Sequence, residues 1–476
     1  MPTRKPVLLV LALLAVSWSR SPSADPALPG VSRASSIVAE ALKTPSAYAR
    51  LRVLTDTIGA RLAGSAAEPR AVAWAKSEFE KDGVPVHLEA VMVPVWIRGE
   101  ERARIVDPVD QPLVILGLGG SVGTPPDGIT APVVVVGSGE ELAALGKEKV
   151  AGKIVLYDNP FIRTGEEFAD YGRAVKYRGQ GASDAARLGA VAALVRSVAT
   201  ATLRTPHTGA MRYADDAPKI PAAAVTIEDA MLIHRLTESG REVRVSLFMG
   251  ARADPDREGA NVVGEIRGRE KPEEIILIGA HLDSWDVGAG AIDDGAGCAI
   301  VLEAMRVIAA GPPPRRTVRA VLFANEENGL RGGRAYRDAH QAELDKHVAA
   351  IEADSGASRA VGLSGRMGEG GVRMLADLLA PLLAPIGAAR FTEGHGGADI
   401  SPLETGGVPL LGLSLESSRY FDWHHTQADT LDKVDPSELQ QAAAAMTGAA
   451  WALADAPGTL PRPPIPPPAP EGARRR

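Results

Sequence analysis

The sequence predicts an α/β fold, a mixed and mainly parallel twisted sheet flanked by helices, with a β-rich domain inserted into it. From residue 260 onward, apolar strand-like runs alternate with helical segments, which is the pattern of a parallel sheet covered by helices. Between 113 and 250, short β-rich runs are separated by Gly and Pro turns. The chain has 476 residues, 45% of them hydrophobic, which is enough for two or three domains.

The expected elements follow in chain order. Two helices are expected over 37–54 and 71–81, because apolar residues recur there at helical spacing. In the insert, strands are expected at 133–136, 154–156, 192–195 and 243–248. Beyond it, strands are expected at 274–278, 318–323, 349–353 and 410–415, with a helix over 299–308. The chain therefore divides into the N-terminal part of the main domain (25–112), the insert (113–250) and the rest of the main domain (251–455).

Both ends of the chain fall outside these domains. Residues 1–24 have a charged start, an apolar run and then small residues, which is the order of a signal peptide. The apolar run is shorter than the roughly 20 residues that span a bilayer. We therefore expect a secreted or periplasmic protein with no stable membrane insertion after signal removal. Residues 456–476 are rich in Pro and end in three arginines, which predicts a disordered tail.

Charge and cysteine content exclude some classes of protein. The net charge is −7, with basic and acidic residues interspersed, so no basic face is offered to a nucleic acid. Cys298 is the only cysteine and cannot form an internal disulfide. Its expected role is that of a small buried residue rather than a metal ligand.

Acidic and imidazole side chains follow the expected strands of the main domain at the points where these strands end. In chain order they are His281 and Asp283, Asp293 at the start of the next helix, Glu326 and Glu327, Asp354, and His425. Ligands of open α/β sheets bind beyond the carboxyl ends of the strands. We therefore expect these side chains to meet at one edge of the sheet.

The residue types at this edge are those of a zinc site. Imidazole and carboxylate are usual zinc ligands, and a hydrolytic site keeps one position open. Two zinc ions about 3.5–4 Å apart need one bridging carboxylate and two further ligands each. Five residues meet this need, with Asp293 as the bridge: His281, Asp293, Glu327, Asp354 and His425.

The neighbouring acids are expected to take catalytic roles. Asp283 is expected to hold the His281 ring by a hydrogen bond. Glu326 is expected to act as the general base that takes the proton from the attacking water. His424 lies beside a candidate ligand, and its roles as bystander or substrate contact are left open.

Two motifs resemble those of the co-catalytic two-zinc aminopeptidase family, in its carboxypeptidase Q-like branch. They are HLDSWDVGAGAIDDGAG at 281–297 and YFDWHHTQADT at 420–430. The resemblance implies a zinc exopeptidase fold of the phosphorylase/hydrolase type, two Zn²⁺ per chain and peptide hydrolysis. It places the metal ligands and the base on the same six residues. The insert resembles a protease-associated domain at 133–136, 152–155, 188–190 and 220–222.

The expected function is that of a metallo-exopeptidase, an aminopeptidase or dipeptidase that hydrolyses short peptides with a free amino terminus. A single-zinc glutaminyl cyclotransferase-like enzyme is one alternative, and two bound zinc equivalents per chain would argue against it. A non-catalytic peptide-binding protein with a structural zinc site is the other, and peptide hydrolysis that chelation abolishes would argue against it. The partners expected are short peptides, and a homodimer is possible.

Overall fold

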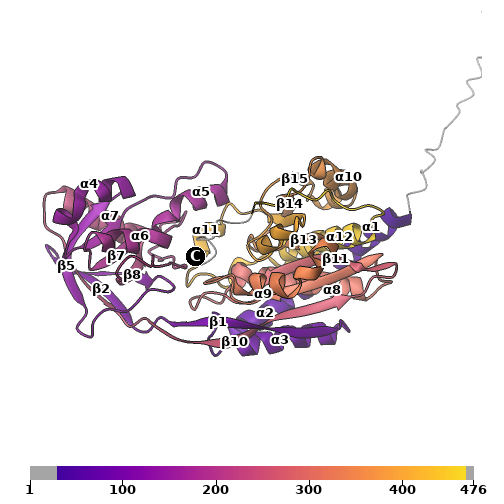
Figure 1. The fold of residues 1–476 in the computed structure, drawn as a ribbon, viewed down its shortest axis with the longest axis horizontal. Coiled ribbons are helices and arrows are strands. Elements are labelled where there is room, and N and C mark those ends of the chain that lie inside the picture. Colours follow the sequence, from indigo (N-terminus) through magenta and orange to yellow (C-terminus); the bar gives the residue numbers. More distant parts are fainter. Residues whose placement is uncertain (1–28, 468–476) are drawn as a thin grey trace, which may run out of the picture.

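The computed structural model describes residues 29–467, so the predicted signal peptide at 1–24 lies outside the described residues. Two lobes are visible in Figure 1, one formed by the main domain and the other by the insert. Within the described residues, no helix is both long and apolar enough to cross a membrane.

The main domain is built on an eight-stranded mixed sheet. Its strands are β1 (Val86–Ile97), β10 (Arg252–Ile266), β11 (Lys271–His281), β12 (Arg316–Phe323), β13 (His347–Glu352), β14 (Ala360–Arg366), β15 (Arg390–Glu393) and β16 (Leu410–Leu415). They are ordered β1-β10-β12-β11-β13-β16-β14-β15. The central strands β12, β11, β13 and β16 are parallel, so their carboxyl ends share one edge.

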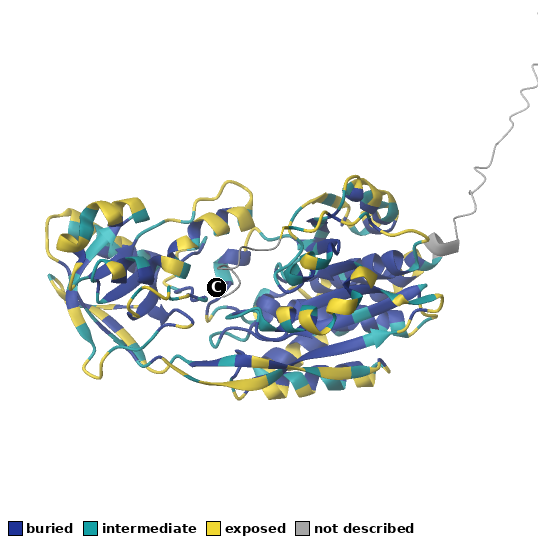
Figure 2. Cartoon of the chain, viewed as in Figure 1, coloured by how far each residue is buried: buried dark blue, intermediate teal, exposed yellow. Residues whose placement is uncertain are grey.

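Helices cover both faces of this sheet. One face carries α1 (Pro29–Ala41), α2 (Ser46–Val53), α3 (Glu68–Lys81), α8 (Ala296–Ala309), α10 (Gly371–Leu383) and α12 (Pro436–Asp455). The other carries α9 (Arg331–Ala339) and the 3₁₀ segments η3 (Gln341–Lys346) and η5 (Ser401–Gly406). Ile276 and Ile278 enter the first core and Leu277 enters the second, so β11 is apolar without interruption from Ile275 to Ala280. Figure 2 shows the central strands as buried.

Local sequence signals explain where two of the helices begin. The Asp435 carboxylate accepts hydrogen bonds from the amides of Ser437 and Glu438, and Pro436 occupies the first position of α12. The helix expected over 37–54 is two helices, because Pro45 precedes α2 and cannot continue α1. The chain continues from α2 into the short π-helix η1 (Leu54–Ile58).

The insert is also an α/β unit rather than a purely β-rich one. Its eight strands are β2 (Glu101–Asp107), β3 (Gln111–Leu113), β4 (Ile115–Gly117), β5 (Ile129–Val136), β6 (Ile154–Tyr157), β7 (Ala192–Arg196), β8 (Ala222–Val225) and β9 (Arg244–Met249). Its helices are α4 (Gly139–Val150), α5 (Glu167–Ala174), α6 (Lys176–Arg187) and α7 (Ile227–Glu238). The strand order is β3-β2-β9-β5-β6-β7-β8-β4, in which β5 to β8 are parallel.

The insert begins earlier than the predicted boundary at residue 113. Strand β2 pairs with β9 and therefore belongs to the second sheet. Ala103 and Ile105 of β2 are buried in the core of the insert, while Arg102 and Arg104, which alternate with them, are exposed. The strand is short, and its charged residues mask the apolar alternation in the sequence. The boundary thus lies between Ile97 and Glu101.

A two-stranded ribbon connects the lobes. Strands β1 and β10 pair antiparallel, and Ile97, which leads into the insert, lies opposite Arg252, which follows it. In Figure 1 the ribbon runs along the lower edge from one lobe toward the other. The chain therefore enters and leaves the insert at adjacent points.

The predicted disordered tail is ordered over its first part, residues 456–467. Leu460 is 4% exposed and belongs to the main core. The Arg462 guanidinium donates to the carbonyl oxygens of Leu344 (2.6 Å) and His347 (2.9 Å). One apolar side chain and one multidentate donor thus fix a segment whose composition alone predicts disorder. Residues 468–476 lie outside the described part of the chain.

Candidate metal centre

The structure brings the five predicted ligands together beyond the parallel strand ends. His281 is the last residue of β11, and Asp293 lies in the π-helical turn η2 (Ala291–Gly295) that precedes α8. Glu327 follows β12, and Asp354 follows β13. His425 follows β16 and the one-turn helix α11 (Tyr420–Trp423). The common edge of the parallel strands is the reason that residues distant in sequence meet here.

Asp293 lies between two groups of side chains. Its Oδ1 is 3.1 Å from His281 Nε2, which in turn is 3.7 Å from Asp354 Oδ1. Its Oδ2 is 3.2 Å from His425 Nε2, which is 3.0 Å from Glu327 Oε2. One carboxylate thus turns one oxygen toward each group, as a carboxylate shared by two cations would.

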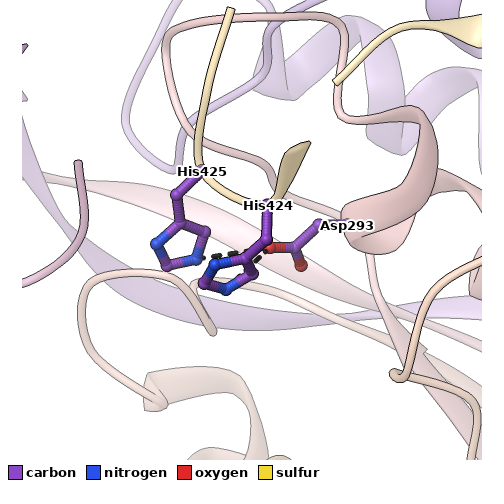
Figure 3. A group of neighbouring side chains, drawn as sticks. All are labelled: Asp293, His424 and His425. Atoms are coloured by element: carbon purple, nitrogen blue, oxygen red, sulfur yellow. Dashed lines mark ion pairs between the residues drawn. The ribbon is translucent and has the colours of Figure 1, made fainter. Parts of the chain in front are cut away.

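Two histidines approach the same oxygen of Asp293 (Figure 3). The His424 and His425 rings are stacked with their centroids 3.5 Å apart, and His424 Nε2 is 3.5 Å from Asp293 Oδ2. His425 Nδ1 donates to the Thr208 carbonyl (3.2 Å), whereas His424 Nδ1 is buried and has no hydrogen-bond partner among residues 29–467. Metal-bound histidines almost always donate their second N–H in this way, so the geometry favours His425 over His424 as a ligand.

The donor set fits divalent metal ions. Within the described residues, no Lys or Arg forms an ion pair with Asp293, Glu327 or Asp354, and Asp293 Oδ2 accepts no hydrogen bond. Burial raises the pKa of Glu327 well above its usual value, and repulsion by Asp293 adds to this. Buried carboxylates are normally paired or coordinate a metal. The missing positive charge is therefore what a metal ion would supply.

Glu326 stands beside these groups but belongs to neither. Its backbone amide donates to Asp283 Oδ1 (3.0 Å), and the preceding Asn325 adopts a left-handed conformation with φ of 61°. Burial raises the pKa of the Glu326 carboxyl well above its usual value, and although His281 opposes this shift, repulsion by Asp354 adds to it. A carboxyl group with a raised pKa is suited to accept a proton near neutral pH.

Asp283 acts on its neighbours differently from the prediction. Its carboxylate Oδ1 is 3.8 Å from His281 Nδ1, which is too long for a hydrogen bond. The Asp283 main-chain carbonyl accepts from that nitrogen at 3.1 Å instead. Because the ring sits over the turn backbone, the carboxylate is left to hold the Glu326 amide.

Two buried charged residues that are not among the predicted site residues hold the loop carrying Asp293. The Arg61 guanidinium donates to the carbonyl oxygens of Leu282 (2.6 Å) and Ala289 (2.7 Å). The Asp429 carboxylate accepts from the amides of Ala291 (2.8 Å), Ile292 (2.7 Å) and Asp293 (3.3 Å). Asp429 lies within the second motif, so its position was visible in the sequence although its partners were not.

The insert also contributes to the site. Thr208 accepts from His425 Nδ1 through its carbonyl and donates its amide to the His425 carbonyl (3.1 Å). His425 has a φ of 62°, which non-glycine residues adopt at a cost, so these two bonds help to hold an unfavourable backbone. Nothing in the sequence connects Thr208 to the motif at 420–430.

A buried set of imidazole and carboxylate side chains with an adjacent carboxyl base, at the carboxyl edge of a parallel sheet, defines a metal-dependent hydrolase. The chain matches peptidase family M28 over residues 261–450 and the PA domain over residues 123–233. Carboxypeptidase Q of Mus musculus is 41% identical over 417 residues, which are 87% of each chain. Carboxypeptidase Q of Homo sapiens is 40% identical over 87% of this chain and 86% of that protein. The chain belongs to peptidase family M28 and is a metallo-exopeptidase with a protease-associated insert.

Solved structures agree with this assignment. The peptidase M28 precursor from Shewanella amazonensis SB2B has a TM-score of 0.88 and 39% identity, covering 92% of this chain and 99% of that one. A zinc aminopeptidase from Bacillus subtilis has a TM-score of 0.63 and 22% identity, covering 85% of this chain and 93% of that one. The second match supports the fold alone.

Proposed function

We propose that this protein is a two-zinc exopeptidase that removes the terminal residue from short peptides with a free amino terminus. The observation that carries the proposal is the position of Asp293, whose oxygens face His281 and Asp354 on one side and Glu327 and His425 on the other. His281 and Asp354 would hold one ion, Glu327 and His425 the other, and Asp293 both.

The residues around this centre have separable tasks. When bound, zinc polarises the scissile carbonyl and lowers the pKa of water. Glu326 takes the proton of the attacking water and passes it to the leaving amine, a role that contributes about 10²- to 10⁴-fold in such enzymes. The Asp283 carboxylate fixes the backbone of Glu326, and the Asp283 carbonyl fixes the His281 ring.

Selection for a free amino terminus follows from charge. Asp293, Glu327 and Asp354 are joined by the carboxyl groups of Glu326 and Asp283, so five acidic groups face the four positive charges of two zinc ions when hydrogen-bonded imidazoles are counted as neutral. An ammonium group can be held by such a carboxylate, and an acetylated nitrogen cannot. A fixed distance from this terminus to the scissile bond restricts cleavage to the terminal residue.

A peptide panel tests the proposal. A dipeptide, its N-acetylated form and its C-terminal amide are assayed with the native enzyme, after chelation, and after zinc is restored. We expect the free dipeptide to be cleaved, chelation to abolish cleavage and zinc to restore it, with two zinc equivalents bound per chain. Equal rates for the acetylated and free peptides would contradict amine recognition. One zinc equivalent, with cyclisation of an N-terminal glutamine, would favour the cyclotransferase alternative.

We further propose that the protein is exported through its N-terminal segment. The supporting observation is the charged, apolar and small-residue order of residues 1–24. N-terminal sequencing of the protein from the producing cells tests this. A mature chain beginning near residue 25 is expected, whereas a full-length chain retained in the cytoplasm would contradict export.

A further inference from the structure

One arginine of the insert reaches the candidate metal centre of the other domain. Arg178 lies on α6, and its Nη1 is 3.5 Å from Nδ1 of His425. The same nitrogen donates to the Tyr171 hydroxyl (2.5 Å) and to the Thr208 carbonyl (3.4 Å). The guanidinium also lies against the Tyr171 ring, 5.4 Å from its centroid. A positive charge from the second lobe is thus placed beside a candidate ligand.

Arg178 has no acidic partner among the described residues. Within the described residues, no carboxylate forms an ion pair with it, and its Nε is buried without a hydrogen-bond partner. Three other arginines of the insert are paired: Arg173 with Asp170, Arg187 with Asp184 and Asp216, and Arg196 with Asp158. Neighbouring Arg212 forms no ion pair among the described residues, but it is exposed to solvent, whereas Arg178 is half-buried.

The chain keeps space for this guanidinium. Gly209 has a φ of 143°, and a Cβ on it would lie 2.3 Å from the Arg178 Cζ. The loop that carries Thr208 to His425 therefore passes Arg178 at a residue without a side chain. A glycine at this point both permits the backbone conformation and leaves room for the charge.

A largely enclosed guanidinium that has no carboxylate partner is unfavourable unless an anion binds to it. Its planar donor fork matches a carboxylate, and a substrate brings one. We propose that Arg178 binds a carboxylate of the substrate and is a specificity-determining residue that the insert contributes. This inference rests on the proposed exopeptidase function. The carboxylate is either the α-carboxylate of a short peptide or the side chain of an acidic residue beyond the scissile bond.

The test compares substrates that differ in one carboxylate. A dipeptide, its C-terminal amide and a dipeptide amide with Glu in second place are assayed with the wild type, Arg178→Gln and Arg178→Lys. For each variant, kcat/KM for the peptide that carries the carboxylate is divided by kcat/KM for the peptide that lacks it. Because a hydrogen bond to a charged group contributes strongly to binding, Arg178→Gln is expected to lower this ratio by roughly 10- to 100-fold, chiefly through KM. Arg178→Lys keeps the charge without the fork and should fall between. Arg173→Gln is the matched control and should keep the wild-type ratio.

The outcomes separate the possibilities. If the Arg178→Gln effect is confined to the free dipeptide, the α-carboxylate is bound; if it is confined to the Glu amide, the side-chain carboxylate is bound. An unchanged ratio, or loss of zinc by Arg178→Gln, would overturn the proposal and make Arg178 a support for His425. If no peptide were cleaved, the proposed function would fail. Calorimetry would then test Arg178 separately: the affinity for the dipeptide relative to its amide should fall in Arg178→Gln, and an unchanged relative affinity would overturn the proposal.

Discussion

Replacement of Asp429 by alanine should destabilise the protein through the loop that carries Asp293. The substitution leaves the buried amides of Ala291, Ile292 and Asp293 without their acceptor. An unsatisfied buried amide costs about 1–3 kcal/mol, and because two of these bonds are short and one is long, we expect roughly 3–6 kcal/mol in total. At about 2–4 °C per kcal/mol for a domain of this size, the melting temperature should fall by roughly 6–24 °C.

The assay combines thermal unfolding with zinc analysis of the purified variants. Asp429→Asn is the matched control, because its side-chain oxygen can still accept from Ala291 and Ile292 while its NH₂ group faces only the Asp293 amide. Its melting temperature should fall by less than that of the alanine variant, and its zinc content should be higher. An alanine variant that melts within about 2 °C of the wild type and retains its zinc would refute the reasoning.

Three further results are expected. Glu326→Gln should keep the zinc content and lower kcat by about 10²- to 10⁴-fold, and a near-wild-type rate would remove Glu326 as the base. Asp293→Ala should bind less zinc than Asp283→Ala, because Asp283 hydrogen-bonds the Glu326 amide and the His281 ring and is not itself one of the candidate ligands. Equal zinc contents in the two variants would mean that Asp283 is a ligand and Asp293 is not. Burial lowers the pKa of His347 to about 4, and the carbonyl of Glu343 accepts from its ring. In the unfolded chain His347 is protonated below its ordinary pKa of about 6.5, whereas in the folded protein it stays neutral down to about pH 4. The free energy of unfolding is therefore highest above pH 6.5, and up to about 3 kcal/mol of it is lost as the pH falls toward 4. His347→Gln should flatten the fall of melting temperature with pH in that interval, and an unchanged slope would exclude His347 as its cause.

The meeting of the five candidate ligands could be predicted because strand direction alone determines it. Apolar runs mark the strands, parallel strands end at one edge, and four of the five candidate residues follow such a run, while Asp293 lies in the turn before the next helix. The detailed contacts of Asp283 could not be predicted, because carboxylate and carbonyl of one residue lie close together and only the turn conformation decides between them. Thr208 and Arg178 could not be found at all, since their places depend on how two domains pack.

The fold was predictable where periodicity is strong and less so where strands are short or charged. The buried strand β11 follows from its uninterrupted apolar run, and the start of the insert was missed because β2 alternates with arginines. The ordered part of the tail was missed because composition averages over many residues. In that segment, burial of the Leu460 side chain and the hydrogen bonds of Arg462 are enough to fix the backbone, although most surrounding residues are prolines.

The position of the insert before every candidate ligand has a consequence for biosynthesis. His281 is the first candidate ligand to be synthesised and His425 the last, whereas the insert is complete by residue 250. Domains fold as units during synthesis, N-terminal ones first, so the insert can present Thr208 before the histidine that it orients has left the ribosome. Fragments that end before residue 425 lack His425 and therefore one of the candidate ligands. The nascent chain therefore has no complete candidate site until residue 425 has been synthesised.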